Sequence, residues 1–297
     1  MIDYFIGVDG GGTGTRVRLA RADGTELAQG ASGPSGLGLG IARAWDAVQQ
    51  AIAAAFAAAG VQQPSLDHVA DAHVAIGLGL AGVHNKQWAA EFVAANPGYA
   101  AVRLETDAFT TLMGAHGGAP GAIVAIGTGS VGEALFADGT RREVGGWGFP
   151  AGDEASGGWI GLRAINHIEQ VLDGRRARSA FADSIIEACG GHRDAGRRDA
   201  IQVWLGKATQ TAYAGLAPLV LRHADDPVAR AILLDAGKEV AGIAHTLDPD
   251  AALPLALCGG LGAALRDFLP AHLLARTTAP QGDSAAGALR MIMKEIQ

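Results

Sequence analysis

The sequence of 297 residues contains only two cysteines, Cys189 and Cys258, which stand far apart without the spacing of metal ligands. This scarcity excludes a disulfide framework and a cysteine-held metal or iron–sulfur cluster. We expect both thiols in the core as small hydrophobic groups of a protein from a reducing compartment. The chain also lacks a basic and apolar leader and any run of about 18 apolar residues. These absences predict a cytoplasmic protein with no membrane partner.

Positive charge is scarce as well. The 23 lysines and arginines are outnumbered by 30 acidic residues, which gives a net charge of −7 and an isoelectric point near 5.7. Without a basic surplus, we expect no nucleic-acid partner. Apolar residues and glycine are abundant, since hydrophobic residues make up 49% of the chain and glycine occupies 44 positions. The length is sufficient for two ordinary domains with filled cores.

Glycine first gathers in the stretch VDGGGTGTR, residues 8–16, directly after an apolar segment (4–9) that predicts a buried strand. The stretch is not a Walker A loop, because no Gly-Lys-Ser/Thr follows, and it lacks the spacing of a dinucleotide fingerprint. Residues 15–22 alternate as a strand, Asp23-Gly24 predicts a hairpin turn, and residues 26–31 return as a third strand.

The same order restarts at Ala122 with the strand AIVAIG, the loop TGS, the strand VGEALFA, the turn Asp138-Gly139 and the returning strand TRREVGG. Thr13 stands ten residues before Asp23, and Thr128 stands ten residues before Asp138. Coincidence is one explanation, because Asp-Gly turns are common. Internal duplication explains better why both loops occupy the same point of the same unit.

The rest of the chain alternates strands and helices up to about residue 116 and is mostly helical from 156 to 247. Apolar periodicity and Gly or Pro boundaries predict helices at 41–59, at 86–95 and from Thr106 or Asp107 to about 116, and strands at 72–80, 101–105 and 253–257. A last helix, capped by Asp283 or Ser284, ends the chain.

Two matched glycine/threonine loops can hold a polyphosphate from both sides, because glycine lets backbone N–H groups approach the oxygens and threonine adds a hydroxyl donor. A carboxylate at the end of the first strand, Asp9, suits hydrated Mg²⁺. A third glycine element, LCGGLGAAL, follows a strand and leaves room for a nucleoside. The residues expected at the nucleotide are Gly10, Gly11, Gly12, Thr13, Thr15, Gly127, Thr128, Gly129, Gly259 and Gly260. Ordinary tight turns and helix–strand packing are the alternatives for each element taken alone.

These loops, in this order, resemble those of the actin, sugar kinase and heat-shock ATPase superfamily. Within it, GGWGFPAGDEASGGWIG, TDAFTTLMGAHG, GLGLAGVHNKQW and PQGDSAAGAL resemble N-acetylglucosamine and glucosamine kinases along essentially the whole chain. The resemblance implies an α/β fold of two ribonuclease H-like lobes with an interdomain nucleotide and sugar cleft. It implies an N-terminal lobe (1–117), a C-terminal lobe (118–283) and a terminal helix (284–297) that packs back on the first lobe. It also implies ATP and Mg²⁺ as cofactors and, by analogy, a homodimer.

Phosphoryl transfer to a sugar hydroxyl needs a base, and Asp107 in LETDAFTT, after a strand and at the start of a helix, suits that role. A plain helix cap is the alternative, and Glu105 is the less favoured base. The resemblance places Gly146, Trp147, Gly148 and Asp153 at the sugar. We expect Ser130 and Ser35 as further sugar contacts, with Ser35 as a partial substitute for a family asparagine. Trp147 in the core and Asp153 as a helix cap are the alternatives there. In one departure, Ser35 and Gly36 stand where many N-acetylglucosamine kinases carry an asparagine.

The sequence therefore predicts an ATP-dependent amino-sugar kinase that converts N-acetylglucosamine to its 6-phosphate, with glucosamine as the alternative substrate. A non-catalytic ATP-binding sugar sensor is the alternative of another class, and Asp107 argues against it. A filament-forming actin relative is disfavoured by the amino-sugar stretch. Repressor-type sugar kinases carry a clustered cysteine motif that this chain lacks, and activator ATPases need cluster cysteines that Cys189 and Cys258 do not supply.

Overall fold

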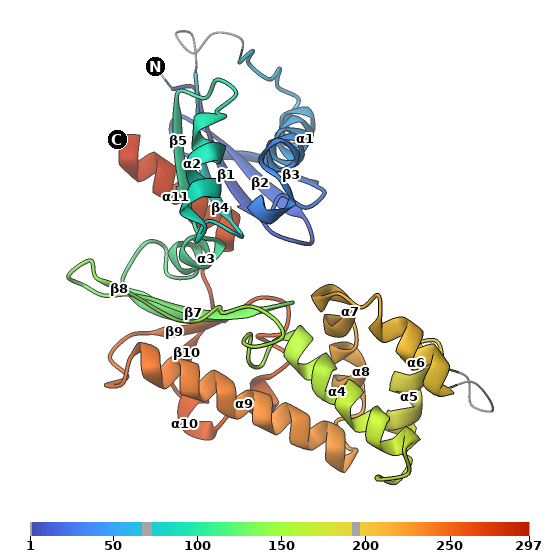
Figure 1. Ribbon diagram of the computed structural model, residues 1–297. Coiled ribbons are helices and arrows are strands. Elements are labelled where there is room, and N and C mark those ends of the chain that lie inside the picture. The colour runs from blue at the N-terminus through green and yellow to red at the C-terminus, as the bar shows by residue number, and fades with distance from the viewer. Residues whose placement is uncertain (1, 67–72, 192–196, 297) are drawn as a thin grey trace. The chain divides into compact units, whose positions relative to one another are not determined.

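The computed structural model describes residues 2–66, 73–191 and 197–296 (Figure 1). The chain divides into two compact units. Unit 1 comprises Met1–Gly121, Leu135–Thr140 and Ala279–Gln297, and unit 2 comprises Ala122–Ala134 and Arg141–Thr278. Each unit is built around a five-stranded sheet with helices beside it.

The sheet of unit 1 has the order β3-β2-β1-β4-β5. Its strands are β1 (Tyr4–Gly10), β2 (Thr15–Arg21), β3 (Glu26–Ser32), β4 (Val74–Leu80) and β5 (Ala101–Glu105). The first three form an antiparallel meander, whereas β4 pairs parallel with β1 and β5 pairs parallel with β4. The strand expected at 72–80 starts at Val74, and Ala72 lies outside the described residues.

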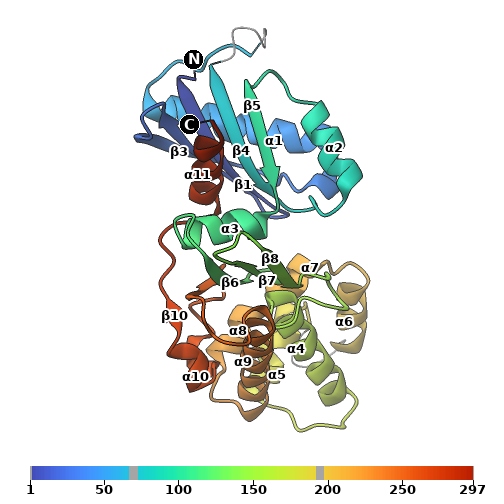
Figure 2. The same ribbon diagram turned by 90° about the vertical axis from the view of Figure 1, so that its left-hand side faces the viewer.

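Helices cover both faces of this sheet (Figures 1 and 2). Helix α1 (Ile41–Ala59) packs on the face of Ile6 and Val8, with Trp45 and Phe56 in the same core. Helix α11 (Ser284–Ile296) packs on the face of Phe5 and Ala75. The contact is close because the strands carry glycine there: a Cβ added to Gly7 would overlap the Ala285 carbonyl of α11. Unit 1 also contains η1 (Leu37–Leu39), α2 (Lys86–Ala94) and α3 (Asp107–Ala115).

The sheet of unit 2 repeats the order of unit 1. Its strands β6 (Gly121–Ile126), β7 (Ser130–Leu135), β8 (Arg141–Gly145), β9 (Leu255–Cys258) and β10 (Thr277–Thr278) lie in the order β10-β9-β6-β7-β8. This order matches, strand for strand, the order of unit 1 read in reverse, β5-β4-β1-β2-β3. Strand β9 pairs parallel with both β6 and β10. The two sheets confirm the duplication. The two-residue strand β10 was not predicted, because so short a strand has no sequence period.

The two hairpin turns are also built alike. Gly24 and Gly139 have φ angles of 86° and 84°, in the region that glycine adopts without strain. In each turn the carboxylate of the aspartate before the glycine accepts the backbone N–H of the threonine after the glycine. Asp23 accepts from Thr25 and Asp138 from Thr140, both at 2.9 Å. Because these are local signals, the sequence was sufficient to predict both turns.

Unit 2 is otherwise helical, as predicted. It contains α4 (Gly157–Leu172), α5 (Ala180–Ala188), α6 (Arg197–Leu205), α7 (Gln210–Ala214), α8 (Ala217–Arg222), α9 (Pro227–Leu247), η3 (Arg266–Phe268) and α10 (Ala271–Leu274). Proline stands near the start of α8 and α9, and Asp226 caps α9. Cys189 and Cys258 are buried and unbridged, as expected. Among the described residues, none of the helices has the length and hydropathy to cross a membrane.

Candidate active site

The first glycine loop, residues 11–14, is held from one side. The Gly11 carbonyl accepts the backbone N–H groups of Ser35 and Gly36, each at 3.1 Å, and the Gly11 N–H donates to the Gly14 carbonyl at 3.1 Å. In a trans peptide the carbonyl and the following N–H point in opposite directions. The N–H of Gly12 therefore points away from Ser35, and it donates to no other described residue. The same holds for the N–H groups of Thr13 and Gly14, so three donors of this loop lack a protein acceptor in the described chain.

Glycine at positions 11 and 12 is not explained by the protein itself. A Cβ added to Gly11 or Gly12 would meet nothing within 4 Å, and neither residue has a positive φ. Gly10 differs, because its Cβ would collide with the Ser35 hydroxyl and with Leu80. Open space beside unpaired N–H donors is the arrangement that an anion such as phosphate requires. Gly10 thus serves packing, and Gly11 and Gly12 leave room for a ligand.

Thr15 and Ser35 lie beneath this loop. Both residues are buried, and the Thr15 hydroxyl stands 2.7 Å from the Ser35 hydroxyl and 2.7 Å from the Gly33 carbonyl. The sequence had placed Thr15 at the nucleotide and Ser35 at the sugar. In the structure both hydroxyls bond inside the protein and support the loop. Thr13, in contrast, is exposed.

The second loop, residues 127–129, is fastened to the start of helix α4. The carbonyls of Gly127 and Thr128 accept the N–H groups of Gly157 and Gly158 at 2.8 and 3.1 Å, and the Gly127 N–H donates to the Gly129 carbonyl at 2.8 Å. By the same peptide geometry, the N–H groups of Thr128 and Gly129 point away from α4. Neither donates to another residue of the described chain, and a Cβ at Gly127 would meet nothing within 4 Å. Both loops thus present outward donors.

The Asp153 side chain supports the second loop from within the protein. It is buried, and its carboxylate accepts the Ser130 N–H at 3.4 Å and the Gln210 side-chain amide at 2.5 Å. Gly129 leaves room for it, since a Cβ there would come within 2.8 Å of a carboxylate oxygen. The Ser130 hydroxyl donates to the Glu154 carbonyl at 2.6 Å. Asp153 and Ser130, both expected at the sugar, therefore have protein partners for these groups. The cap of α4 is Ser156, so Asp153 is not that cap.

Trp147 is the most exposed large hydrophobic side chain in the described chain, at 86% of its accessible surface. It stands between Gly146 and Gly148, whose φ angles of 71° and 87° are both positive. This excludes the alternative in which Trp147 fills the core. An indole ring held outward by a glycine loop is available to a sugar, whose apolar face stacks on aromatic rings.

The two glycines after β9 have different roles. Gly259 has a φ of 79°, and a Cβ there would overlap the Ile126 carbonyl, so the fold itself requires glycine. A Cβ on Gly260 would meet nothing within 4 Å. Of this pair, only Gly260 leaves space that the protein does not use.

Asp107 is the first residue of helix α3 but does not cap it. The cap is Thr106, whose hydroxyl accepts the Phe109 N–H at 3.1 Å, while the Asp107 carboxylate accepts the Ala108 N–H at 3.0 Å. Burial raises the pKa of the half-buried Asp107 carboxyl above its ordinary value, and the negative charge of Asp9 raises it further. A carboxylate with a raised pKa, not required as a cap, has the properties of a general base.

The other acidic candidates in unit 1 are ion-paired. The Asp9 carboxylate accepts the Arg16 guanidinium at 2.6 and 3.1 Å, and the Glu105 carboxylate stands 2.9 Å from Arg103. Asp9 supplies a carboxylate oxygen of the kind that Mg²⁺ binds through water and phosphate. Within the described ranges, no group of three or more His, Cys, Asp or Glu residues could hold a metal by itself. Asp9 therefore fits a magnesium ion that takes its other ligands from water and a nucleotide.

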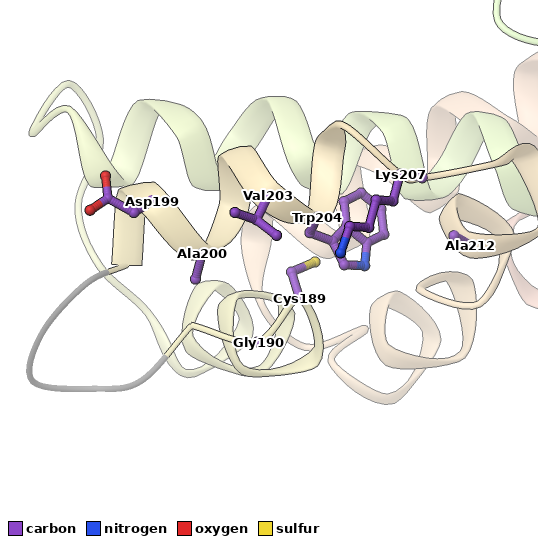
Figure 3. A pocket seen from close by; sticks show the side chains of 9 residues that line it. Cys189, Gly190, Asp199, Ala200, Val203, Trp204, Lys207 and Ala212 are labelled. Carbon is purple, nitrogen blue, oxygen red and sulfur yellow. The ribbon is translucent and has the colours of Figure 1, made fainter.

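A cavity of about 560 Å³ lies in unit 2, next to helix α6 (Figure 3). None of the predicted site residues lines it. Its lining residues are Cys189, Gly190, Asp199, Ala200, Val203, Trp204, Lys207, Ala208 and Ala212. Burial raises the pKa of the Cys189 thiol to about 12, so this group is protonated and unreactive at neutral pH. The cavity shares no residue with the loops.

The two units have sheets of equal strand order, and in each unit a glycine/threonine loop with N–H groups unbonded in the described chain follows the first strand. These features are typical of the actin-like ATPase class of proteins. The chain matches the model of the BadF/BadG/BcrA/BcrD ATPase family over residues 6–253, and it belongs to that family. This confirms the superfamily that the motifs indicated.

The chain is also similar to two curated amino-sugar kinases and to a solved structure. The chain is 32% identical over 291 residues to the glucosamine kinase GspK of Vibrio cholerae, which covers 97% of this chain and 95% of that protein. It is 27% identical over 282 residues to the N-acetyl-D-glucosamine kinase of Dictyostelium discoideum, with 87% and 85% covered. A solved structure from Chromobacterium violaceum, provisionally named an N-acetylglucosamine kinase, shares 52% identity and a TM-score of 0.92 over 98% of this chain and 99% of that one. The predicted α/β fold is thereby confirmed.

Gln210 was not among the residues predicted from the sequence, although its side-chain amide donates to the Thr128 carbonyl, 82 positions earlier in the chain. No local motif marks such a contact. The indirect signal is the glycine set of SGGWIG at the start of α4, whose members face α7: a Cβ on Gly157 would lie 3.0 Å from Ala214, and one on Gly161 would overlap the Tyr213 carbonyl.

Proposed function

We propose that this protein is an ATP-dependent amino-sugar kinase that transfers the γ-phosphoryl group of ATP to the 6-hydroxyl of N-acetylglucosamine. Membership in an ATPase family and relatives named as amino-sugar kinases support the proposal. The observation that carries it is the pair of loops, each with N–H donors turned outward beside glycines that the protein's own packing does not require.

In this proposal the loops bind phosphate oxygens. The N–H groups of Gly12, Thr13 and Gly14 in one loop, and of Thr128 and Gly129 in the other, supply preorganised donors for the charge that phosphoryl transfer spreads over the oxygens. The exposed Thr13 hydroxyl adds a donor, and Gly260 leaves space for the nucleoside. Asp9 holds Mg²⁺, which neutralises phosphate charge when bound.

Asp107 acts as the general base in this proposal. A sugar hydroxyl is a weak nucleophile at neutral pH, so a carboxylate must take its proton as the new bond to phosphorus forms. The raised pKa of Asp107 makes it a stronger base than an exposed aspartate, while it remains able to ionise. Glu105 is less suited, because its carboxylate is already engaged by the Arg103 guanidinium at 2.9 Å.

The choice between the two amino sugars depends on the surroundings of the 2-substituent. An acetamide requires an apolar wall, which the exposed indole of Trp147 and the adjoining Phe149 provide. A free ammonium requires a carboxylate, and the Asp153 carboxylate is already bonded to Ser130 and Gln210. We therefore favour N-acetylglucosamine. Glucosamine is the second candidate, supported by the glucosamine kinase of Vibrio cholerae and by the half-buried Glu154.

The proposal includes a homodimer working in the cytoplasm, which sedimentation velocity and cell fractionation test separately from the chemistry. The chemistry is tested by ADP release with N-acetylglucosamine, glucosamine, glucose and N-acetylmannosamine, together with identification of the phosphorylated carbon by ³¹P–¹H correlation. We expect a 6-phosphate and a higher kcat/KM for N-acetylglucosamine. A tenfold preference for glucosamine, equivalent to ~1.4 kcal/mol, would reverse the substrate assignment. Binding of ATP and sugar without turnover would identify a sensor instead of a kinase.

A further inference from the structure

The Gln210 side chain bonds both to the second loop, at Thr128, and to Asp153, whose carboxylate supports that loop. Gln210 is the first residue of helix α7, and its side-chain amide nitrogen lies 3.2 Å from the Thr128 carbonyl and 2.5 Å from the Asp153 carboxylate. An amide group carries two hydrogens, so it can donate to both acceptors. The bond to Asp153 is charge-assisted, and such bonds are stronger than neutral ones.

The position of Gln210 is built into the packing of two helices. Thr209 caps α7 by accepting the Ala212 N–H at 3.4 Å, and this fixes where the helix starts. Glycine on α4 then lets α7 approach, since a Cβ on Gly158 would lie 3.1 Å from Cγ of Gln210 and 3.2 Å from the Thr128 carbonyl. A side chain at 158 would require Gln210 to shift by a few tenths of an ångström. The Gln210 side chain is therefore seated by the close contact of α4 and α7.

The two bonds fix the direction of a donor that faces the ligand side. The Thr128 carbonyl is held by Gln210 together with the Gly158 N–H, and this turns the Gly129 N–H of the same peptide outward. The second acceptor, Asp153, holds the Ser130 N–H just after the loop. The Gln210 amide therefore links α7 directly to Thr128, in the middle of the loop, and through Asp153 to Ser130, just after its end.

We propose that Gln210 is a positioning residue that orients the second loop toward the phosphates of the nucleotide. The inference rests on the proposed function, because it takes this loop to bind phosphate. Gln210 need not touch the nucleotide, since it acts through the Thr128–Gly129 peptide and through Asp153. Its loss should weaken nucleotide binding and phosphoryl transfer and leave binding of the sugar nearly unchanged.

Two variants of similar size separate hydrogen-bond donation from space filling. Gln210→Met keeps the size of the side chain and removes its N–H donor. Gln210→Glu keeps the shape but places a carboxylate oxygen against the Thr128 carbonyl and the Asp153 carboxylate, which are both acceptors. Gln202→Met is the matched control, because Gln202 is an exposed glutamine on the neighbouring helix α6. The measurements are kcat and KM for ATP and for the sugar, the Kd of MgADP by calorimetry, and the melting temperature of each variant.

We expect Gln210→Met to lower kcat/KM for ATP by about tenfold or more, and to weaken MgADP binding, with the KM for the sugar changed by less than about twofold. Gln210→Glu should lose more than Gln210→Met, because like-charged carboxylates then face each other. The control should behave as wild type. A space-filling role predicts wild-type behaviour of Gln210→Met and would overturn the proposal, as would a loss confined to the sugar KM.

The failure of this inference is distinguishable from failure of the kinase assignment. If the wild type transfers phosphate and Gln210→Met is unimpaired, only the role of Gln210 is wrong. If the wild type transfers none, the MgADP titration still tests the role of Gln210, since it needs no turnover. If Gln210→Glu does not fold, Gln210→Met decides alone, and a melting temperature close to wild type shows that its fold is intact.

Discussion

The hydroxyl of Thr106, and not the carboxylate of Asp107, caps helix α3 by accepting the Phe109 N–H at 3.1 Å. Neighbouring residues thus carry separate roles, one holding the helix and the other leaving a carboxylate of raised pKa at its start. This separation makes the proposed base testable, because stability and activity should respond to different substitutions.

Removal of the cap should cost stability. Thr106→Val keeps the shape and removes the oxygen, so we expect a loss of about 1 kcal/mol in the free energy of unfolding, measured by urea denaturation. Thr106→Ser keeps the hydroxyl and should stay near wild type. Asp107→Asn should show no comparable loss. If Asp107→Asn destabilises as much as Thr106→Val, then Asp107 is a structural cap after all.

The pH dependence of stability reports on the same carboxyl. Its pKa is raised in the folded state, so the protonated form is favoured there, and the wild type loses stability as the pH rises from about 4, the ordinary aspartate pKa, through the folded pKa. Asp107→Asn has no charge to bury. We expect its melting temperature, measured in EDTA without nucleotide, to match wild type at low pH and to exceed it increasingly toward neutral pH. A difference that is constant across this range would show that the pKa is not raised.

Arg16 should compete with magnesium for Asp9. The pair has a nitrogen–oxygen distance of 2.6 Å, but the arginine side chain is 67% exposed, so the pair is weak and easily replaced. Arg16→Gln should lower the Mg²⁺ concentration for half-maximal rate by up to about fivefold, as expected for removal of an exposed pair. Arg175→Gln, which removes a similarly exposed pair with Asp173, is the control. An unchanged magnesium requirement in Arg16→Gln would count against Asp9 as the metal site.

Thr13 in the first loop and Thr15 at the start of β2 should affect different properties of the protein. Thr15→Val leaves the buried Ser35 hydroxyl without its 2.7 Å partner and should destabilise the protein by about 1–3 kcal/mol. Thr13→Val removes an exposed hydroxyl and should leave the melting temperature unchanged while lowering kcat/KM for ATP. Thr128→Val should behave like Thr13→Val. Equal melting losses in Thr13→Val and Thr15→Val would mean that the loop's outward side is structural.

The sequence predicted most of the fold because its strongest signals are local. Asp-Gly turns and alternating strands gave the two matching hairpins, and the glycine loops could be recognised from their composition. The burial of the Thr15 side chain could also have been predicted from the sequence. The alternation that predicted its strand puts Thr15 on the buried side with Val17 and Leu19, so a threonine of this loop should have been assigned inward.

The details of the candidate site could not be predicted, because they depend on contacts between distant segments. The bond between Gln210 and Asp153 spans 57 positions, and the Ser35 hydroxyl, in the loop after β3, bonds to Thr15 of β2. The exposure of Trp147 likewise depends on how its glycine loop leaves β8, since composition alone favours an indole in the core.

Phosphoryl transfer by Asp107→Asn tests the central claim most directly. Asparagine keeps the shape and the hydrogen bond of the side chain but cannot accept a proton, and general-base assistance contributes ~10²–10⁴-fold. With ATP, Mg²⁺ and N-acetylglucosamine, we expect the wild type to form the sugar 6-phosphate. We expect Asp107→Asn to lose at least about two orders of magnitude in kcat, with little change in the KM for the sugar. A near-normal kcat in Asp107→Asn, at a melting temperature no lower than wild type, would contradict the assignment of Asp107 as the base.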